Sequence, residues 1–310
     1  MSRPVDWVFL ISGYPYTHRS SGIRALYRLC HHLNVSGYPT AVIAEPGEPL
    51  PDWNCFLPDG FLHDGAVSGA VVVYPEVVAG NPLQADKVVR WVLNTPGLLG
   101  GDPTYDDSEL VFVYDLQRLP EVNLAVSESI GPERELWMGL IDPAVIYRDP
   151  HTTRDIDCSF TYKGADLART IPLPDSGEIH PLESLTTDLS SLGQVLRRTR
   201  TLYSYDHYSN LLREAVISGC EVRVPDESGD WHDPRYCSCE RNIRWHPDVE
   251  TAYVEHFHSS DFVTGFIEQV RTRWDLPAAD ARWVRGLPFG APSGRRRAAM
   301  AWRRLVRTGR

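Results

Sequence analysis

The sequence predicts an α/β protein that contains two doubly wound parallel sheets. Its 310 residues leave room for two domains. In each half, apolar runs of strand length alternate with segments whose apolar residues recur every three or four positions. A stretch with three X-Pro breaks, residues 127–157, separates the halves. We therefore expect an N-terminal domain over 1–150, a C-terminal domain over 151–275 and an extension over 276–310.

The first half contains five runs that predict strands and two segments that predict helices. The strand-like runs are rich in Val, Leu, Ile and Phe and end at turn residues. They cover residues 5–11, 40–44, 70–74, 110–114 and 122–126. One helix is expected from the capping serines 20 and 21 to Gly37, and the other from Pro82 to about residue 93 because Val88, Val89, Val92 and Leu93 follow a helical spacing.

The second half repeats the alternation. Strands are expected over 158–162, 201–204 and 221–224, and helices over 185–198, 208–218 and 261–274. Gly219 follows the second of these helices and supplies a C-terminal stop. The pattern therefore predicts a second sheet of the same class.

The composition excludes several classes of protein. The chain is 42% hydrophobic and 23% charged, which is outside the range of collagenous and fully disordered chains. No run approaches the roughly 18 apolar residues of a membrane span. Six irregularly spaced cysteines fit a reducing compartment, so we expect a cytoplasmic protein.

Charge is distributed unevenly along the chain. Residues 294–310 hold seven arginines and no acid, and the remaining chain has 24 basic residues against 41 acidic ones. Such an acidic body disfavours nucleic acid as the main partner.

Residues 202–222 carry the strongest functional signal. They predict a strand, a short loop, a helix, a glycine stop and a strand, and open α/β sheets bind ligands at the carboxyl ends of strands. The backbone amides of Tyr208, Ser209 and Asn210, with the Ser209 hydroxyl, are expected at the helix N-terminus, where they would hold a diphosphate.

Two acidic residues flank this expected helix start. Asp206 precedes it, and Glu214 follows eight residues later, roughly two helical turns along. One carboxylate could thus meet one end of an elongated ligand while the other meets a pair of hydroxyls farther along.

This stretch resembles the acidic-x7-acidic signature of nucleotide-sugar glycosyltransferases of the GT-B fold, in particular the retaining, family 4-like group. Residues 89–97 are similar to a segment in some bacterial members. The resemblance implies two Rossmann-like domains facing across a cleft, with Glu214 binding the ribose of the donor. The resemblance also implies that Asp206 is a catalytic residue that contacts the donor sugar or its phosphate. Glutamate is usual at this position.

The resemblance also implies a basic pair that neutralises the leaving diphosphate. Lys163, at the end of the first strand of the second half, fits the first position and is the second catalytic candidate. Arg169 is the nearest candidate for the second position and is assigned to donor binding.

The loop after the first strand contributes further candidates. It lacks a G-x-G-x-x-G fingerprint, so NAD or FAD binding is not supported. Gly13 could permit a close backbone approach to the donor. His18, Arg19 and Glu76 are acceptor-side candidates, with Glu76 as a base.

We expect no metal site and no tightly bound cofactor; the nucleotide sugar is a co-substrate. Asp155 and Asp157 form a D-x-D, which occurs often by chance and lies in a connection. A second set does not have the spacing of a usual zinc finger: His232, Cys237, Cys239 and His246.

The expected partners are a nucleotide sugar and a hydroxyl acceptor, with a glycan or lipid-linked glycan favoured and DNA also considered. The arginine-rich residues 294–310 also contain Met, Trp, Leu and Val, and such a segment could contact the inner membrane face. A solvated tail, a helix packed on the acidic body and a patch for a polyanionic acceptor are the other readings of this segment.

The sequence therefore predicts a metal-independent glycosyltransferase, and two alternatives stand beside it. One is another sugar-nucleotide enzyme of the epimerase type. The other is a non-catalytic protein that binds a sugar or a polyanion.

Overall fold

The computed structural model describes residues 6–51, 53–55, 67, 69–175, 177–235 and 255–286. Contacts divide the chain into two compact units. The first unit comprises Met1–Tyr16, Gly22–Met138 and Ser259–Arg310, and the second comprises Thr17–Ser21 and Gly139–His258. Among the described residues, no helix combines the length and apolar character that crossing a membrane requires.

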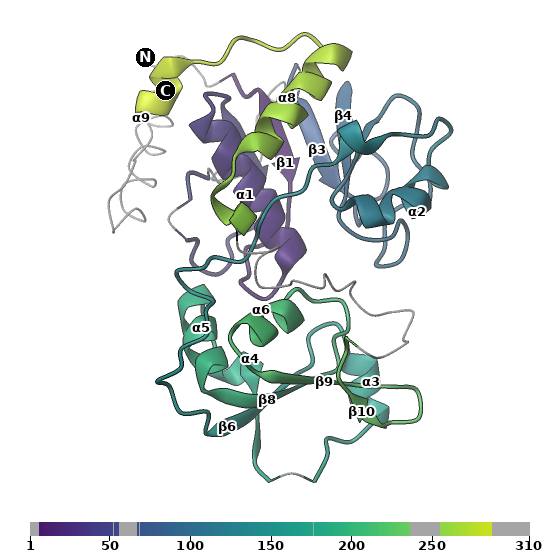
Figure 1. Ribbon diagram of the computed structural model, residues 1–310. Helices are drawn as coiled ribbons and strands as arrows, with labels where there is room; N and C mark the ends of the chain where they lie inside the picture. The colour runs from purple at the N-terminus through teal and green to yellow at the C-terminus, as the bar shows by residue number, and fades with distance from the viewer. Residues whose placement is uncertain are drawn as a thin grey trace. The chain divides into compact units, whose positions relative to one another are not determined.

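The first unit contains a parallel sheet with strand order β2-β1-β3-β4-β5 in its described part; Figure 1 labels β1, β3 and β4 of this sheet. The strands are β1 (Phe9–Ser12), β2 (Thr40–Ile43), β3 (Val71–Pro75), β4 (Lys87–Val92) and β5 (Leu110–Val113). Nearly every residue in these strands is buried, as expected for a parallel sheet covered on both faces.

The first unit also contains α-helices and short 3₁₀ turns. The longest is α1, Ser21–Val35, which ends before Gly37 with its φ of 89°. The other helical segments are η1 (Leu116–Arg118), α2 (Leu119–Asn123), η2 (Pro132–Arg134), α8 (Asp261–Arg273) and α9 (Ala281–Gly286).

Two of the predicted elements in this unit are wrong. The segment expected as a helix from Pro82 contains strand β4, and the strand expected over 122–126 does not form, because its first two residues belong to α2. Val88, Val89 and Val92 satisfy a helical spacing, but they also suit a strand that is buried on both faces and therefore shows no alternation. Pro120, in the first turn of α2, favours a helix start at that point.

Helix α8 packs in the first unit, although the sequence placed it in a domain over 151–275. The Phe266 ring lies 5.6 Å from that of Phe9 in β1 and 5.0 Å from that of Phe112 in β5, centroid to centroid. Its predicted apolar stripe exists, but nothing in the local sequence says which sheet the stripe covers. The chain thus returns to its first sheet after leaving the second unit (Figure 1).

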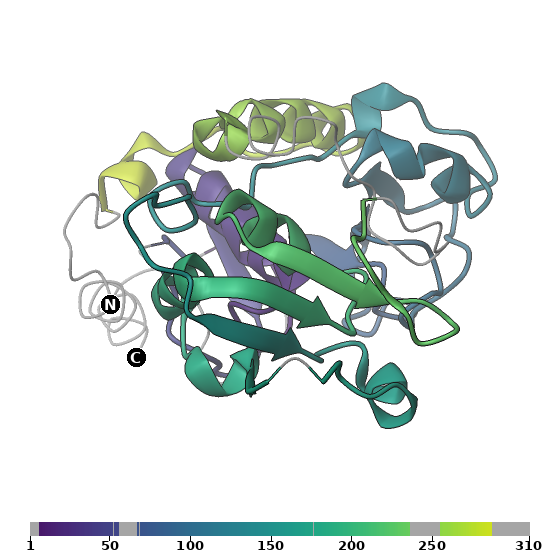
Figure 2. The same ribbon diagram turned by 60° about the horizontal axis from the view of Figure 1, so that its bottom comes forward.

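The second unit contains a sheet of order β10-β9-β8-β6-β7 in its described part, parallel except for the β9–β10 hairpin (Figure 2). The strands are β6 (Ile156–Phe160), β7 (Ile179–Pro181), β8 (Thr199–Ser204), β9 (Glu221–Pro225) and β10 (Trp231–His232). The helical segments are α3 (Ala165–Thr170), α4 (Leu182–Leu185), α5 (Leu189–Arg198), α6 (Leu211–Ile217) and η3 (Glu255–His258).

Each unit is therefore a Rossmann-like α/β layer structure, and the predicted fold class is confirmed. In the second unit, β6 and β8 are adjacent and parallel, so the segments that follow them leave the same edge of the sheet. Those two segments contain Lys163 and Asp206.

Candidate functional site

The turn after β6 and the loop after β8 are in direct backbone contact. The Tyr205 amide donates to the Phe160 carbonyl at 2.9 Å, which extends the β6–β8 pairing by one residue. A Cβ atom on Gly164 would lie 2.1 Å from the Tyr205 carbonyl oxygen. Only glycine fits at that separation, so Gly164 permits the turn after β6 to lie against the loop after β8.

Asp206 is fully buried directly after this contact. Its Oδ1 accepts hydrogen bonds from the Tyr208 amide at 2.8 Å and the Ser209 amide at 3.0 Å. Its Oδ2 is buried and accepts no hydrogen bond from the described residues. Burial raises the pKa of the Asp206 carboxyl, while the Lys163 ammonium and the neighbouring backbone amides act in the opposite direction.

Lys163 is exposed, and its positive charge is near enough to favour the ionised form of this carboxyl group. The two residues that the sequence analysis assigned to catalysis therefore lie in the segments that follow two adjacent parallel strands. An exposed ammonium in this position can bind an anionic ligand, and the nearby carboxylate favours its charged form.

The expected diphosphate cradle is filled by the protein itself. Helix α6 begins at Leu211, later than the predicted Tyr208, because the Asp206 carboxylate turns the preceding backbone and takes the Tyr208 and Ser209 amides. The Ser209 hydroxyl accepts from the Leu211 amide at 3.2 Å. The Tyr208 and Ser209 amides and the Ser209 hydroxyl therefore form hydrogen bonds within the protein, whereas the sequence analysis expected them to bind a phosphate.

Asn210 and Glu214 belong to the same segment. Asn210 Oδ1 accepts from Arg213 Nη1 at 3.1 Å, and the Asn210 carbonyl accepts the Glu214 amide at 3.1 Å. The Glu214 side chain is almost fully buried within α6. Any hydroxyl that it binds would be excluded from bulk water.

Arg169 lies apart from this pair. It is in α3, its side chain is 75% exposed, and it pairs with Asp166 at 2.7 Å. An exposed pair of this kind, three residues apart on a short helix, contributes little to stability.

Two of the candidates from the first half have structural roles in the first unit. The Gly13 amide donates to the Ile43 carbonyl, and a Cβ at Gly13 would lie 2.7 Å from Val42 Cγ1, so the space beside it is filled by β2. Glu76 is buried, and its Oε2 accepts the Leu93 amide at 3.0 Å.

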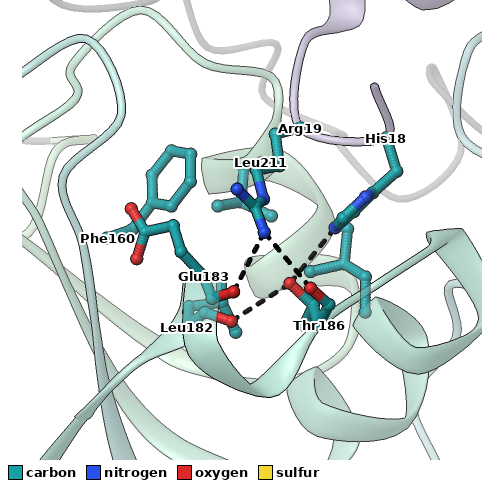
Figure 3. Close-up of a pocket in the computed structure, with 8 residues that line it drawn as sticks. His18, Arg19, Phe160, Leu182, Glu183, Thr186 and Leu211 are labelled. Carbon is teal, nitrogen blue, oxygen red and sulfur yellow. Dashed lines mark hydrogen bonds between the residues drawn. The ribbon is translucent and has the colours of Figure 1, made fainter. Parts of the chain in front are cut away.

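His18 and Arg19 pack in the second unit, against the short helix α4 (Figure 3). Arg19 Nη2 donates to the Glu183 carbonyl at 2.9 Å and to the Thr186 carbonyl at 3.2 Å. The buried His18 contacts Thr186 Oγ1 through Nε2 at 3.1 Å. With Phe160, Leu182 and Leu211, these residues line a narrow hollow beside the carboxyl end of β6.

Glu183, which the sequence analysis did not identify, lies at the edge of that hollow. Its Oε1 accepts the Thr161 amide at 2.8 Å and the Tyr162 amide at 3.2 Å. The linear pattern contains no signal for this contact, because the partners are 22 and 21 positions apart.

The two D-x-D carboxylates, which lie at the start of β6, form ion pairs with arginines from the end of α5 and from β8. Asp155 pairs with Arg198 at 2.8 Å, and Asp157 pairs with Arg200 and accepts the Thr201 amide at 3.0 Å. They lie at the amino end of the strand, opposite the end that leads to Lys163.

Of the zinc candidates, only His232 lies within the described residues; Cys237, Cys239 and His246 lie outside them. His232 Nε2 lies 2.8 Å from Asp226 Oδ2 in the β9–β10 hairpin. Ligand atoms of Asp226, Asp230 and His232 lie within 4.8 Å of one another, in the part of the chain that is described. Asp226 Oδ1 also accepts the Ser228 and Asp230 amides, as in a closed hairpin turn.

No family model matches the chain, and no curated protein matches it. Among solved structures, the chain is similar to WaaG, a glycosyltransferase involved in lipopolysaccharide biosynthesis. The identity is 12%, the TM-score is 0.43, and the alignment covers 91% of this chain and 100% of that chain. A similarity of this degree does not indicate the function, which has to be inferred from the residues of the site.

Proposed function

We propose that the protein is a glycosyltransferase that transfers a sugar from a nucleoside-diphosphate donor to a hydroxyl acceptor, with retention of configuration, as in the family 4-like group. The observation that supports this most is that Lys163 and Asp206 follow the carboxyl ends of the adjacent parallel strands β6 and β8, with the positive charge of Lys163 near enough to lower the pKa of Asp206. Glu214 follows in α6 at the spacing of the acidic-x7-acidic signature.

In this proposal Lys163 stabilises the leaving diphosphate. Negative charge builds on the departing phosphate as the sugar–phosphate bond breaks, and a fixed cation at that point lowers the barrier. An ammonium can supply the charge that a divalent cation supplies elsewhere, so we propose a metal-independent reaction without a tightly bound cofactor.

Asp206 and Glu214 complete the proposed site. The Oδ2 of Asp206, which accepts no hydrogen bond from the described residues, is proposed to act on the donor sugar or its phosphate. Glu214 is proposed to bind the ribose hydroxyls. Since the Tyr208 and Ser209 amides already serve Asp206, the diphosphate contact is assigned to Lys163 alone.

The acceptor is proposed to be a glycan or a lipid-linked glycan, and the location is proposed to be cytoplasmic, at the inner membrane face. The arginine-rich residues 294–310, which lie outside the described residues, are proposed to make the peripheral membrane contact. DNA is a weaker candidate because the rest of the chain is acidic.

The experiment is a screen of thermal stabilisation and turnover against UDP-, GDP-, ADP-, CMP- and dTDP-sugars. One donor is expected to raise Tm and to be slowly hydrolysed. Lys163→Ala is expected to lower kcat about 100-fold with little change in KM, since it removes charge stabilisation in the transition state. Glu214→Ala is expected to weaken donor binding.

The matched control is Lys87→Ala, at the start of β4 in the first unit, where the lysine donates to the Gly69 carbonyl. It should leave donor turnover unchanged. Binding of a donor without turnover by the wild type would favour the non-catalytic alternative. Wild-type kinetics in both the Lys163 and the Glu214 variants would refute the assignment of the site.

A further inference from the structure

The turn that presents Lys163 is held by a carboxylate from another element. Thr161 and Tyr162 follow the last residue of β6, and both of their amides donate to Oε1 of Glu183. The Gly164 amide then donates to the Thr161 carbonyl and closes the turn. One side-chain oxygen thus satisfies two backbone donors that the sheet leaves unpaired.

Glu183 is itself fixed through the backbone of α4. The Thr186 hydroxyl donates to the Leu182 carbonyl at 3.0 Å, which means that its oxygen accepts from His18 Nε2. The Arg19 guanidinium bridges the Glu183 and Thr186 carbonyls at the end of this helix (Figure 3). A cation on those carbonyls is favourable, because the last turn of a helix leaves them unpaired.

The other end of the turn is fixed by a backbone contact. Gly164 lies against the Tyr205 carbonyl, immediately before Asp206. Lys163, which like Tyr162 is exposed, therefore lies in a turn that is held at its start by Glu183 and at its end by Tyr205.

We propose that Glu183 is a positioning residue that holds the 161–164 turn and thereby sets where the Lys163 ammonium stands. This role rests on the proposed function of Lys163. Without the carboxylate, two amides lose their acceptor and the start of the turn is released, while the end at Tyr205 stays. Small displacements of a charge-stabilising group cost large factors in rate.

The kinetic test compares three substitutions. Glu183→Ala is expected to lower kcat about 10- to 100-fold at nearly constant KM. Glu183→Gln keeps a carbonyl oxygen that can accept both amides, so it is expected to retain most of the activity. The control is Glu178→Ala, since the Glu178 side chain is 83% exposed.

A double substitution separates positioning from a general loss of stability. If Glu183 acts through Lys163, adding Glu183→Ala to Lys163→Ala changes kcat by no more than about twofold. Independent, multiplicative losses in the double variant would overturn the proposal. So would equal losses in Glu183→Gln and Glu183→Ala.

A second readout needs no donor, because the chain contains only two lysines, Lys87 and Lys163. Reductive methylation with ¹³C-formaldehyde gives one NMR signal for each, assigned with Lys163→Arg. In Glu183→Ala the Lys163 signal is expected to shift and sharpen while the Lys87 signal stays. An unchanged Lys163 signal would refute the positioning role. Absence of wild-type turnover with every donor would refute the proposed function alone.

Discussion

At the residue scale, a few side chains are engaged with the backbone around them in ways that a linear sequence displays only in part. Asp206 was expected to contact a ligand, and it also caps its own loop through the Tyr208 and Ser209 amides. An aspartate three residues before a serine at a helix start is a capping pattern, so this signal was available in the sequence. Glu183 had no such signal, because its partners lie in the turn after β6, 22 and 21 positions away along the chain.

Gly164 provides the prediction at this scale. Gly164→Ala would place a Cβ 2.1 Å from the Tyr205 carbonyl oxygen, so the β6 turn or the β8 loop has to move. We expect a loss of about 1–3 kcal/mol in the free energy of unfolding. Urea denaturation measures it.

The control for this prediction is Gly265→Ala. Gly265 is exposed in α8, and a Cβ there would meet nothing within 4 Å. Alanine favours the helix over glycine by up to about 1 kcal/mol, so this variant should be as stable as the wild type or more so. If both substitutions had the same effect, the close approach at Gly164 would not explain the loss.

At the element scale, the sequence predicts strands and helices well where only one reading of the apolar pattern is available. It predicts β1, β2, β3, β5, β6, β8, β9, α1 and α5 to within a few residues. It fails at β4, where valines suit both a helix stripe and a buried strand. It also fails at α2, a five-residue helix whose amphipathic pattern is too short to read.

Two histidines of α1, one of which packs against α8, are expected to make the stability of the protein depend on pH. The His32 ring contacts that of Phe262 in α8, with centroids 4.9 Å apart, and also that of His31. Burial, with the nearby Arg28 cation, lowers the pKa of His31 to about 4 and that of His32 to about 3. Both are below the ordinary value of about 6.5.

The fold therefore favours the neutral imidazoles. Their contribution to stability is complete above about pH 6.5 and is lost as the pH falls toward the folded-state values, because the unfolded chain binds protons first. We expect each of the two histidines to lower the free energy of unfolding by about 2 kcal/mol between pH 7 and 4.5, so that the pair lowers it by about 4–5 kcal/mol. Urea denaturation at several pH values measures this slope.

Substitution separates these histidines from the rest of the chain. His32→Phe keeps an aromatic ring against Phe262 and removes one titrating group, so its stability should depend less on pH over this interval. His151→Asn, at an exposed site, should keep the wild-type slope. Parallel slopes for wild type and His32→Phe would contradict the assignment.

At the scale of the whole molecule, the fold class is predictable because it depends on the order of element types, which the sequence displays. The unit to which α8 belongs cannot be predicted in this way, because a buried apolar stripe on a helix does not indicate which sheet the helix covers. The ring contacts of Phe266 with Phe9 and Phe112 place α8 on the sheet of the first unit. The first unit is thus built from both ends of the chain.

This assignment predicts where a substitution in α8 acts. Phe266→Ala should lower the free energy of unfolding of the first unit by about 3–5 kcal/mol. In hydrogen exchange, amides of β1 and β5 should lose protection while those of β8 and β9 keep it. Glu268→Ala, exposed on the same helix, should change neither set. Loss of protection confined to β8 and β9 would return α8 to the second unit.

The membership of residues 17–21 in the second unit has a practical consequence for protein engineering. A chimera that imports only residues 139–258 would leave α4 without the His18 and Arg19 contacts, although no residue of the imported segment had changed. The transferable module is therefore discontinuous. A graft that aims to keep the Lys163 turn intact must carry the pentapeptide as well, joined through a linker or supplied as a separate peptide.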